Sequence, residues 1–242
     1  MAGSVMGTHE GGDRLATSLV EQLRSMRQAE RDVFGALDPI VRDRPMRPGD
    51  WSPKDHQAHL TAWKAIQRDR IRATAKGETL AADARETDER NAELQALRAD
   101  WSWADVVREA DSVDEELRAE IVAGGSALLV ETEGMVGRIF GNSAIHALTH
   151  FAWLVDAGIG VDPARVAAFV DEHERQLEGT PLPDADRAIA LYNLACAHAV
   201  AGRLDRARPL LRAAFQLQPD LAEFAREDPD LVRLREELPA IR

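Results

Sequence analysis

The chain has 242 residues, of which 45% are hydrophobic and 30% are charged. Acidic side chains outnumber basic ones by 42 to 30, so the formal net charge is −12 at pH 7. Nucleic acids and anionic membrane surfaces both bind basic faces, and Lys and Arg do not cluster in this chain, so we expect neither partner. No apolar run approaches the roughly 18 residues that span a bilayer.

Cysteine content and the first residues bear on the cellular compartment. Cys196 is the single cysteine, which excludes an internal disulfide and a site built from several thiolates. Residues 1–13 are polar and rich in glycine, and they carry no hydrophobic stretch of the kind found in a secretory signal. We therefore expect a flexible N-terminus over residues 1–13 and a soluble, cytoplasmic protein.

Hydrophobic residues recur at helical spacing along most of the chain, and strand-like alternation is nearly absent, which predicts an all-α fold. Ser52 with Asp55, and Ser102 with Asp105, form capping boxes that predict two helix starts. Long amphipathic helices are expected over residues 14–37, 52–76, 103–121 and 136–157. Such a pattern predicts an antiparallel four-helix bundle over residues 14–160.

The polar parts of this region are interpreted as loop or surface. Residues 80–98 are rich in polar side chains and alanine, and we expect a loop followed by a short helix there. Charged runs on the first and third long helices, such as residues 114–116, are interpreted as solvated helix faces.

Residues 161–242 have no tryptophan, more alanine and arginine, and shorter helical segments, which predicts a separate helical module. Small and turn-forming residues in it follow the spacing of a tetratricopeptide unit, at Ala195, Gly202, Ala207, Ala214 and Pro219. One clear unit is fewer than the roughly three that bury a continuous core. We therefore expect the tetratricopeptide-like module either to cap the bundle or to bind a protein partner in a groove.

Four of the seven histidines fall into two helical windows, His56 with His59 and His146 with His150. Histidines four residues apart project from one helix face at a spacing that suits one metal ion. Metal sites in bundles are built from facing helices, and His59 is the better third ligand because the residues that continue its face are apolar. Three nitrogen ligands leave positions open, as in catalytic sites, and suit Zn, Ni, Fe or Mn. Alternatively, these histidines are hydrogen-bonded core side chains.

Two motifs resemble a known family. The segment 51–55, Trp-Ser-Pro-Lys-Asp, with His59-Leu60 and Trp63, resembles the W-S-x-x-D-x-x-x-H-L-x-x-W signature of the DinB-like superfamily. Residues 146–153, which read His-Ala-Leu-Thr-His-Phe-Ala-Trp, are similar to the closing H-Y/F-x-W motif of its ClbS/DfsB branch. Residues 88–91, Asp-Glu-Arg-Asn, resemble the connector before the third helix of that branch. The resemblance spans about residues 14–158.

The resemblance implies that His59, His146 and His150 hold a divalent metal. It also implies chemistry on a small electrophile, because related proteins are thiol-dependent transferases and isomerases, while ClbS-like proteins open a reactive cyclopropane to protect their producers. A low-molecular-weight thiol as cosubstrate and a homodimer follow from the same resemblance. Two features depart from that branch: many ClbS-like proteins lack the full set of three histidines, and the tetratricopeptide-like module is not typical of it.

We therefore expect a metal-dependent protein that acts on a small-molecule substrate by hydrolytic ring opening or thiol transfer, in self-resistance or detoxification. Its substrate pocket is expected to be lined by His56, Trp63, Phe140, Phe151 and Trp153. The sequence identifies no catalytic side chain. The alternative is a non-catalytic protein that sequesters a hydrophobic metabolite or binds a protein partner through the tetratricopeptide-like module.

Overall fold

A computed structural model describes residues 6–47, 50–78 and 87–241, and for residues 6–13 and 126–127 it describes the backbone alone. These residues form helices and connecting turns, with no strand among them. None of the described helices is long and apolar enough to cross a membrane. The chain divides into two compact units, Met1–Met135 and Val136–Arg242.

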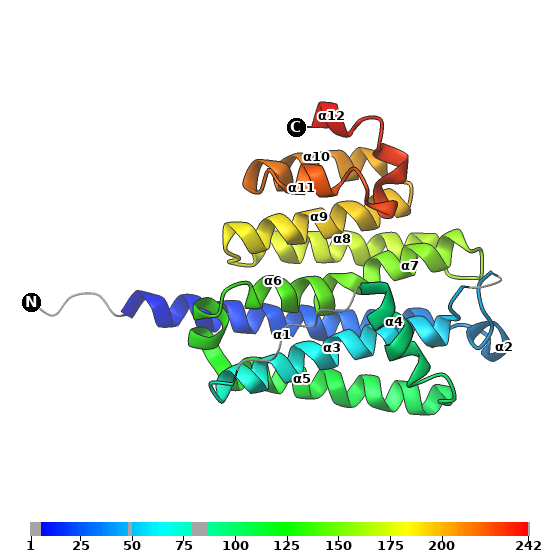
Figure 1. The fold of residues 1–242 in the computed structure, drawn as a ribbon, viewed down its shortest axis with the longest axis horizontal. Coiled ribbons are helices and arrows are strands. Elements are labelled where there is room, and N and C mark those ends of the chain that lie inside the picture. Colours follow the sequence, from blue (N-terminus) through cyan, green and yellow to red (C-terminus); the bar gives the residue numbers. More distant parts are fainter. Residues whose placement is uncertain (1–5, 48–49, 79–86, 242) are drawn as a thin grey trace, which may run out of the picture. The chain divides into compact units, whose positions relative to one another are not determined.

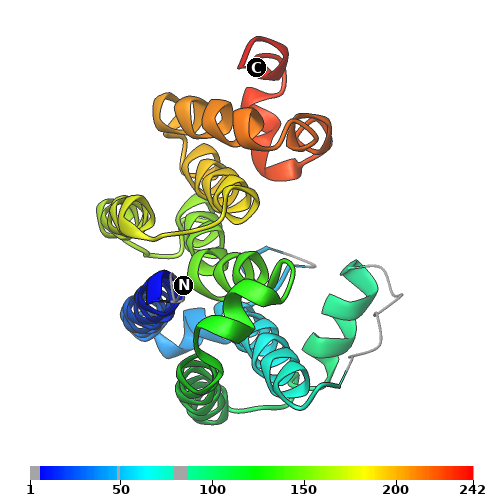
Figure 2. The same cartoon turned by 90° about the vertical axis from the view of Figure 1, so that its left-hand side faces the viewer.

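Three long helices build the first unit, α1 (Met6–Phe34), α3 (Pro53–Ala75) and α5 (Trp103–Glu131). Each packs against the other two (Figures 1 and 2). Two short helices, α2 (Pro39–Arg42) and α4 (Thr87–Ala96), contact α3. The core of this unit is made by one apolar stripe on each long helix, including Leu19, Leu23, Met26, Leu60, Ile71, Leu117 and Ile121.

Local sequence signals account for where the long helices of this unit begin. Both predicted capping boxes are present: the Ser52 hydroxyl accepts from the Asp55 backbone N–H, and Ser102 does the same with Asp105. Helix α5 continues to Glu131, beyond its expected end at residue 121. The expected break is a kink instead, at Gly125, whose φ of 58° is one that glycine adopts without strain.

Residues 1–13 and 80–98 of the first unit are the polar segments for which we expected a flexible N-terminus and a loop with a short helix. The first helix, expected from residue 14, begins at Met6, so residues 6–13 are helical where we expected a flexible N-terminus. Residues 1–5, which belong to the same expectation, lie outside the described residues. The short helix expected before Arg98 is α4, while the expected loop over 80–86 also lies outside the described residues.

The second unit is a succession of shorter helical segments. In chain order they are α6 (Met135–Ile139), the π-helix η1 (Phe140–Ile145), α7 (His146–Asp156), α8 (Pro163–Gly179), α9 (Asp184–Val200), α10 (Leu204–Leu217), α11 (Leu221–Phe224), the 3-10 helix η2 (Pro229–Leu234) and α12 (Leu238–Ile241). Helix α9 is central in this unit, because α7, α8, α10, η1 and η2 all pack against it (Figure 1).

The division between the units falls earlier than the boundary that we expected near residue 160. The fourth long helix, expected over 136–157, consists of α6, η1 and α7, and it belongs to the second unit. The reason is that α7 packs against α8 and α9, which follow it in the chain. Three of the four expected long helices thus pack together in the first unit, and the fourth shares a core with the C-terminal helices.

The hairpin of α9 and α10 explains the spacing of small residues in this part of the sequence. Ala195, Ala207 and Ala214 have no exposed surface, which lets the two helices pack closely (Figure 1). Gly202 forms the turn between them with a φ of 75°. Beyond this hairpin, residues 229–234 form the 3-10 helix η2, and a turn follows it.

Candidate metal centre

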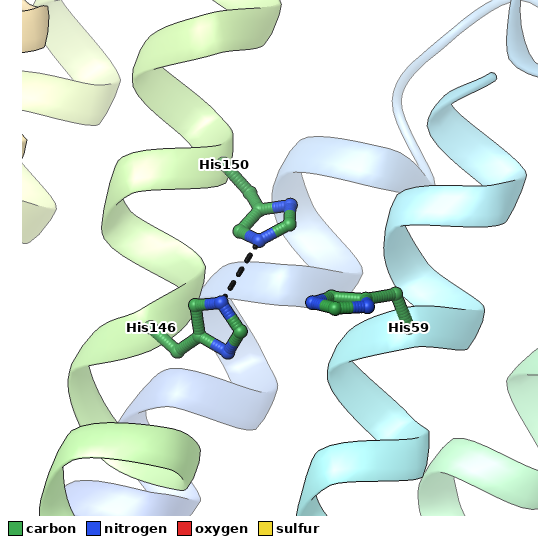
Figure 3. A group of neighbouring side chains, drawn as sticks. All are labelled: His59, His146 and His150. Carbon is green, nitrogen blue, oxygen red and sulfur yellow. Dashed lines mark hydrogen bonds between the residues drawn. The ribbon is translucent and has the colours of Figure 1, made fainter. Parts of the chain in front are cut away.

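His146 and His150 form the central pair of the candidate site. Both project from the same face of α7, and their Nε2 atoms are 3.1 Å apart (Figure 3). The ring centroids are 4.7 Å apart in an edge-to-face arrangement. His150 is 1% exposed, whereas His146 is half-buried. The predicted spacing therefore brings two imidazole nitrogens together in the interior.

The π-helix η1 determines on which face of α7 these two histidines lie. The backbone N–H of His146 donates to the carbonyl of Gly141, five residues earlier, which closes the wide turn. A π turn inserted into an α-helix shifts the faces on which all later side chains lie, and such turns are frequent at functional sites. Gly141 lies against α9, where a Cβ would be in ordinary contact with the Asn193 side-chain nitrogen at 3.4 Å.

The distance within the pair fits two ligands of one metal ion. Ligand nitrogens about 2.1 Å from an ion, at roughly 90–109° to each other, lie about 3.0–3.4 Å apart. The observed 3.1 Å between the Nε2 atoms falls in this interval. Neutral imidazole is also a favourable ligand for Zn, Ni and Fe. The donor set and its spacing are therefore suited to a divalent transition metal.

His59, the third predicted ligand, projects from α3 of the first unit (Figure 3). It is 6% exposed, and its ring centroid lies 4.7 Å from that of Trp51 and 6.3 Å from that of Trp63. His56, one turn earlier, is buried and packs edge-on against Trp51 at 5.5 Å. The ring of Trp51 thus contacts both histidines of this window.

Helix α4 fixes the position of Trp63 in the first unit. The Trp63 indole Nε1–H donates to the Asn91 side-chain oxygen at 3.2 Å. The Arg90 guanidinium lies over the same indole, 5.1 Å from the ring centroid. Arg90 and Asn91 thus bring α4 into direct contact with α3, the helix that carries His59.

The expected pocket residues of the second unit have two different environments. Phe140 and Phe151 are at most 1% exposed, and Phe151 packs against Phe169 with 6.3 Å between the ring centroids. Both phenylalanines are therefore core side chains of this unit. Trp153 is only half-buried, and its ring lies 4.7 Å from that of His150. Trp153 therefore contacts the histidine pair directly.

A second group of side chains with metal-ligand spacing joins α8 and α9. Ligand atoms of Asp171, Glu174 and His198 lie within 4.8 Å of one another. Two guanidinium groups are already present there, because Arg206 pairs with Glu174 at 2.8 Å and Arg203 pairs with Asp171. His198 contacts Glu174 at 3.0 Å, and burial lowers the pKa of this imidazole. We interpret this group as an ion-pair network that fastens α8 to the α9–α10 hairpin.

A third group surrounds Cys196, with Asp228 and Asp230 within 4.8 Å. The Tyr192 hydroxyl donates to Asp228 at 2.6 Å, the Cys196 thiol lies 3.7 Å from the same oxygen, and the other Asp228 oxygen accepts from the Asp230 backbone N–H. Burial raises the pKa of the Cys196 thiol, which disfavours a reactive thiolate. Cys196 is thus a buried core side chain of this unit.

A buried charge cluster in the first unit was not expected from the sequence. Glu30 is fully buried and pairs with Lys64 of α3 at 2.7 Å and with Arg27 at 3.0 Å. Lys64 also faces Asp114 of α5 at 3.5 Å. Asp114 is 1% exposed and pairs with Arg118, so the interpretation of residues 114–116 as a solvated face is wrong for Asp114.

A sequence signal for this cluster exists. Glu30 follows Met26 by four residues and precedes Val33 by three, so it occupies a position in the apolar stripe of α1. Lys64 follows Leu60 by four in the same way on α3. Opposite charges at apolar positions of two helices predict a buried pair, because a charge is stable in a core only when it is matched.

A scan of protein-family models and searches of curated proteins and of solved structures gave no match to this chain. The class of protein is therefore argued from the helical fold and from the histidines themselves.

Proposed function

We propose that this chain is a DinB-like metal-dependent protein in which His59, His146 and His150 hold one divalent transition metal ion. The observation that carries the proposal is the His146–His150 pair, whose Nε2 atoms are 3.1 Å apart on one face of α7. His59 is proposed as the third ligand because it is buried in a signature segment that resembles the second helix of DinB-like bundles. The four-helix bundle of that family is part of the same proposal.

The proposed activity is the opening or substitution of a small electrophilic substrate, either by water or by a low-molecular-weight thiol. A bound divalent metal supplies Lewis acidity, which lowers the pKa of the water or thiol that it coordinates. The three histidines would supply ligand nitrogens and leave coordination positions open for a nucleophile. Such an activity would serve self-resistance or detoxification, and the substrate is defined here only as a small electrophile.

Two tryptophans are proposed to line the substrate side of this site. Trp63 is held by Asn91 and Arg90 of α4, and Trp153 contacts His150. Both indoles are only half-buried, so part of each ring is accessible to a ligand. Indole rings exclude water and bind apolar molecules, which suits a site that must direct one nucleophile to an electrophilic carbon. His56 is proposed to support His59 through Trp51, which both rings contact.

Elemental analysis of the full chain, purified without chelator, tests the metal proposal. We expect close to one transition-metal ion per chain, and loss of that metal in His59→Ala and in His150→Ala. His198→Gln is the matched control, because it removes a buried imidazole from a network that already contains guanidinium groups. Metal content below about a tenth of an equivalent in the wild-type protein would overturn the proposal, since such sites bind tightly when their ligands are deprotonated.

The non-catalytic alternative is favoured by a different observation, the α9–α10 hairpin with its closely packed alanines. We infer that this hairpin is tetratricopeptide-like, and such units commonly serve as protein-binding surfaces. A wild-type protein without metal that captures a defined protein partner through this hairpin would support that alternative.

A further inference from the structure

Charged side chains meet in a regular series along the interface between α3 and α5 of the first unit. In each pair a basic residue of α3 faces an acidic residue of α5, at Lys64–Asp114 (3.5 Å), Arg68–Glu116 (3.3 Å) and Arg72–Glu120 (2.6 Å). Residue numbers rise together in these pairs, so the two helices run in the same direction and are not an antiparallel pair (Figure 1). The pairs therefore define the axial register of α5 against α3.

The Lys64 pair differs from the others in its burial. The side chains of Lys64 and Asp114 are 3% and 1% exposed, whereas those of Arg72 and Glu120 are 37% and 26% exposed. Exposed pairs contribute little, because water solvates each charge when the pair breaks, but a buried charge that loses its partner is costly. Glu30 of α1, with no exposed surface, holds the same ammonium at 2.7 Å. The register therefore depends mainly on what lies beside Lys64.

The other contacts of α5 discriminate only weakly between registers. Its buried apolar residues recur every three or four positions, at Val106, Ala110, Val113, Leu117 and Ile121. A shift of α5 by one helical turn, about 5 Å, would therefore again bring apolar residues to the apolar stripe of α3. If each residue of α5 took the place of the residue four before it, Arg27 would exchange Asp111, now at 2.7 Å, for Glu115.

Lys64, by contrast, discriminates against a one-turn shift in either direction. The shift just described replaces Asp114 by Arg118, which would place a guanidinium beside the Lys64 ammonium. The opposite shift brings Ala110 there and leaves Lys64 without its carboxylate from α5. In the observed register, Arg118 pairs with Asp114 at 2.8 Å. Among these three registers, only the observed one gives Lys64 an opposite charge on α5.

We propose that Lys64 is a positioning residue: with Glu30 and Asp114 it sets the axial register of α3 against α5, and thereby the position of His59 on α3. The consequence for metal binding rests on the proposed function, whereas the role in the register does not. Buried polar residues fix the register of coiled coils in a comparable way, at a cost in stability. Apolar side chains in place of the three charges should therefore preserve folding but allow more than one register.

Distances between spin labels on the two helices measure the register in the full chain. Ala75 is the last residue of α3 and Ala104 is the second residue of α5, and both are exposed. Labels on cysteines at these positions are well separated along the axis, so a one-turn shift changes their distance by about 5 Å. Cys196 is buried, so the two introduced thiols take the labels.

The main variant combines Glu30→Met, Lys64→Met and Asp114→Leu. We expect one label distance in the chain that keeps these three charges. In the triple variant we expect a second distance about 5 Å from the first, without a loss of thermal stability, because apolar residues of similar volume replace buried ion pairs at little or no cost.

A second variant changes almost no side-chain volume, which guards against a failure to fold. Asp114→Asn with Arg118→Gln makes the two residues that can lie beside Lys64 nearly equivalent, so the second distance should appear here as well. Arg72→Gln is the matched control, because it removes partly exposed pairs between the same two helices. We expect this control to keep a single distance.

Zn²⁺ affinity, measured by competition with a chelating dye, is the second readout. The apparent dissociation constant should rise by the reciprocal of the fraction of molecules that keep the original register, and it should not change in Arg72→Gln. A single, unchanged distance in the folded triple variant, or in the double variant if the triple variant does not fold, would overturn the role of Lys64. So would a second distance in Arg72→Gln. If the wild-type protein binds no Zn²⁺ but the label distances respond as expected, the proposed function fails while the register role stands.

Discussion

Glu30 is the residue whose environment departs most from that of an ordinary carboxylate. It has no exposed surface, and its charge is matched by Lys64 and Arg27, while Gln57 donates a further hydrogen bond at 3.3 Å. Burial by itself raises the pKa of this carboxyl, but the two cations outweigh that effect, so the pKa of Glu30 is lowered. The cluster links α1, α3 and α5, and it therefore fixes the rotation of the helix that carries His59.

Glu30→Gln tests how far the first unit depends on this charge. We expect the free energy of unfolding to fall by about 3–5 kcal/mol at pH 7, because the substitution leaves Lys64 buried without its closest counter-ion. Urea unfolding of the full chain measures this loss. Glu223→Gln, which breaks a pair that is more than half exposed, is the control and should change stability by less than about 1 kcal/mol.

The pH dependence of the free energy of unfolding, compared between wild type and Glu30→Gln, is a second test of the role of Glu30. Because the folded-state pKa of Glu30 lies below its ordinary value of 4.5, its charge stabilises the fold above that pH. This contribution is lost as the pH falls through the folded-state pKa. The difference in the free energy of unfolding between wild type and Glu30→Gln should therefore become smaller below about pH 4. A constant difference down to about pH 3 would contradict the ion-pair explanation.

At the scale of elements, the turns between helices are fixed by glycines whose conformations differ. Gly202 joins α9 to α10 with a φ of 75°, and a Cβ there would lie 3.1 Å from the Arg233 guanidinium. Gly179, the last residue of α8, has no positive φ, and a Cβ there would meet no atom within 4 Å. The two positions look alike in the sequence, since each follows a run of helical residues.

Substituting alanine for each of these two glycines should change the stability of the protein in different ways. Gly202→Ala should destabilise the protein by about 1–2 kcal/mol, because an L-residue is strained in the left-handed region. Gly179→Ala should be neutral or slightly stabilising, since it only reduces the freedom of the unfolded chain. Thermal unfolding followed by circular dichroism measures both. Equal losses in the two variants would show that backbone conformation is not what selects glycine at residue 202.

At the scale of the whole molecule, the chain contains two units, each with its own core. The proposed ligands are drawn from both, with His59 in the first and the His146–His150 pair in the second. Any ligand that binds only the folded state stabilises it by mass action. A metal held by all three histidines would therefore stabilise the protein as a whole.

Metal addition should raise the melting temperature of the wild-type chain. Zn²⁺ at a free concentration about 100 times its dissociation constant should add about 2.7 kcal/mol to the free energy of unfolding. Excess EDTA should return the melting temperature to the metal-free value, and His59→Ala and His150→Ala should show no rise at the same Zn²⁺ concentration. An identical rise in all three proteins would place the bound metal elsewhere.

Features with local causes could be predicted from the sequence. The helical class, both capping boxes, the ends of α3 and the pairing of His146 with His150 follow from periodicity and from neighbours within four residues. Trp63 follows His59 by four residues on α3, and the two rings are in contact, as this spacing predicts. Such features are readable because the interacting groups are close together in the chain, where helix geometry fixes their separation.

Features with distant causes were decided only by the tertiary structure. The charge cluster of Glu30 and Lys64 and the division of the chain after Met135 both depend on packing between residues far apart in sequence. The π-helix before His146 belongs with them, because it lies against α9, some 40 residues further on. The sequence by itself therefore determined the helices and the histidine pair. Packing between distant segments decided which charges are buried and where the units divide.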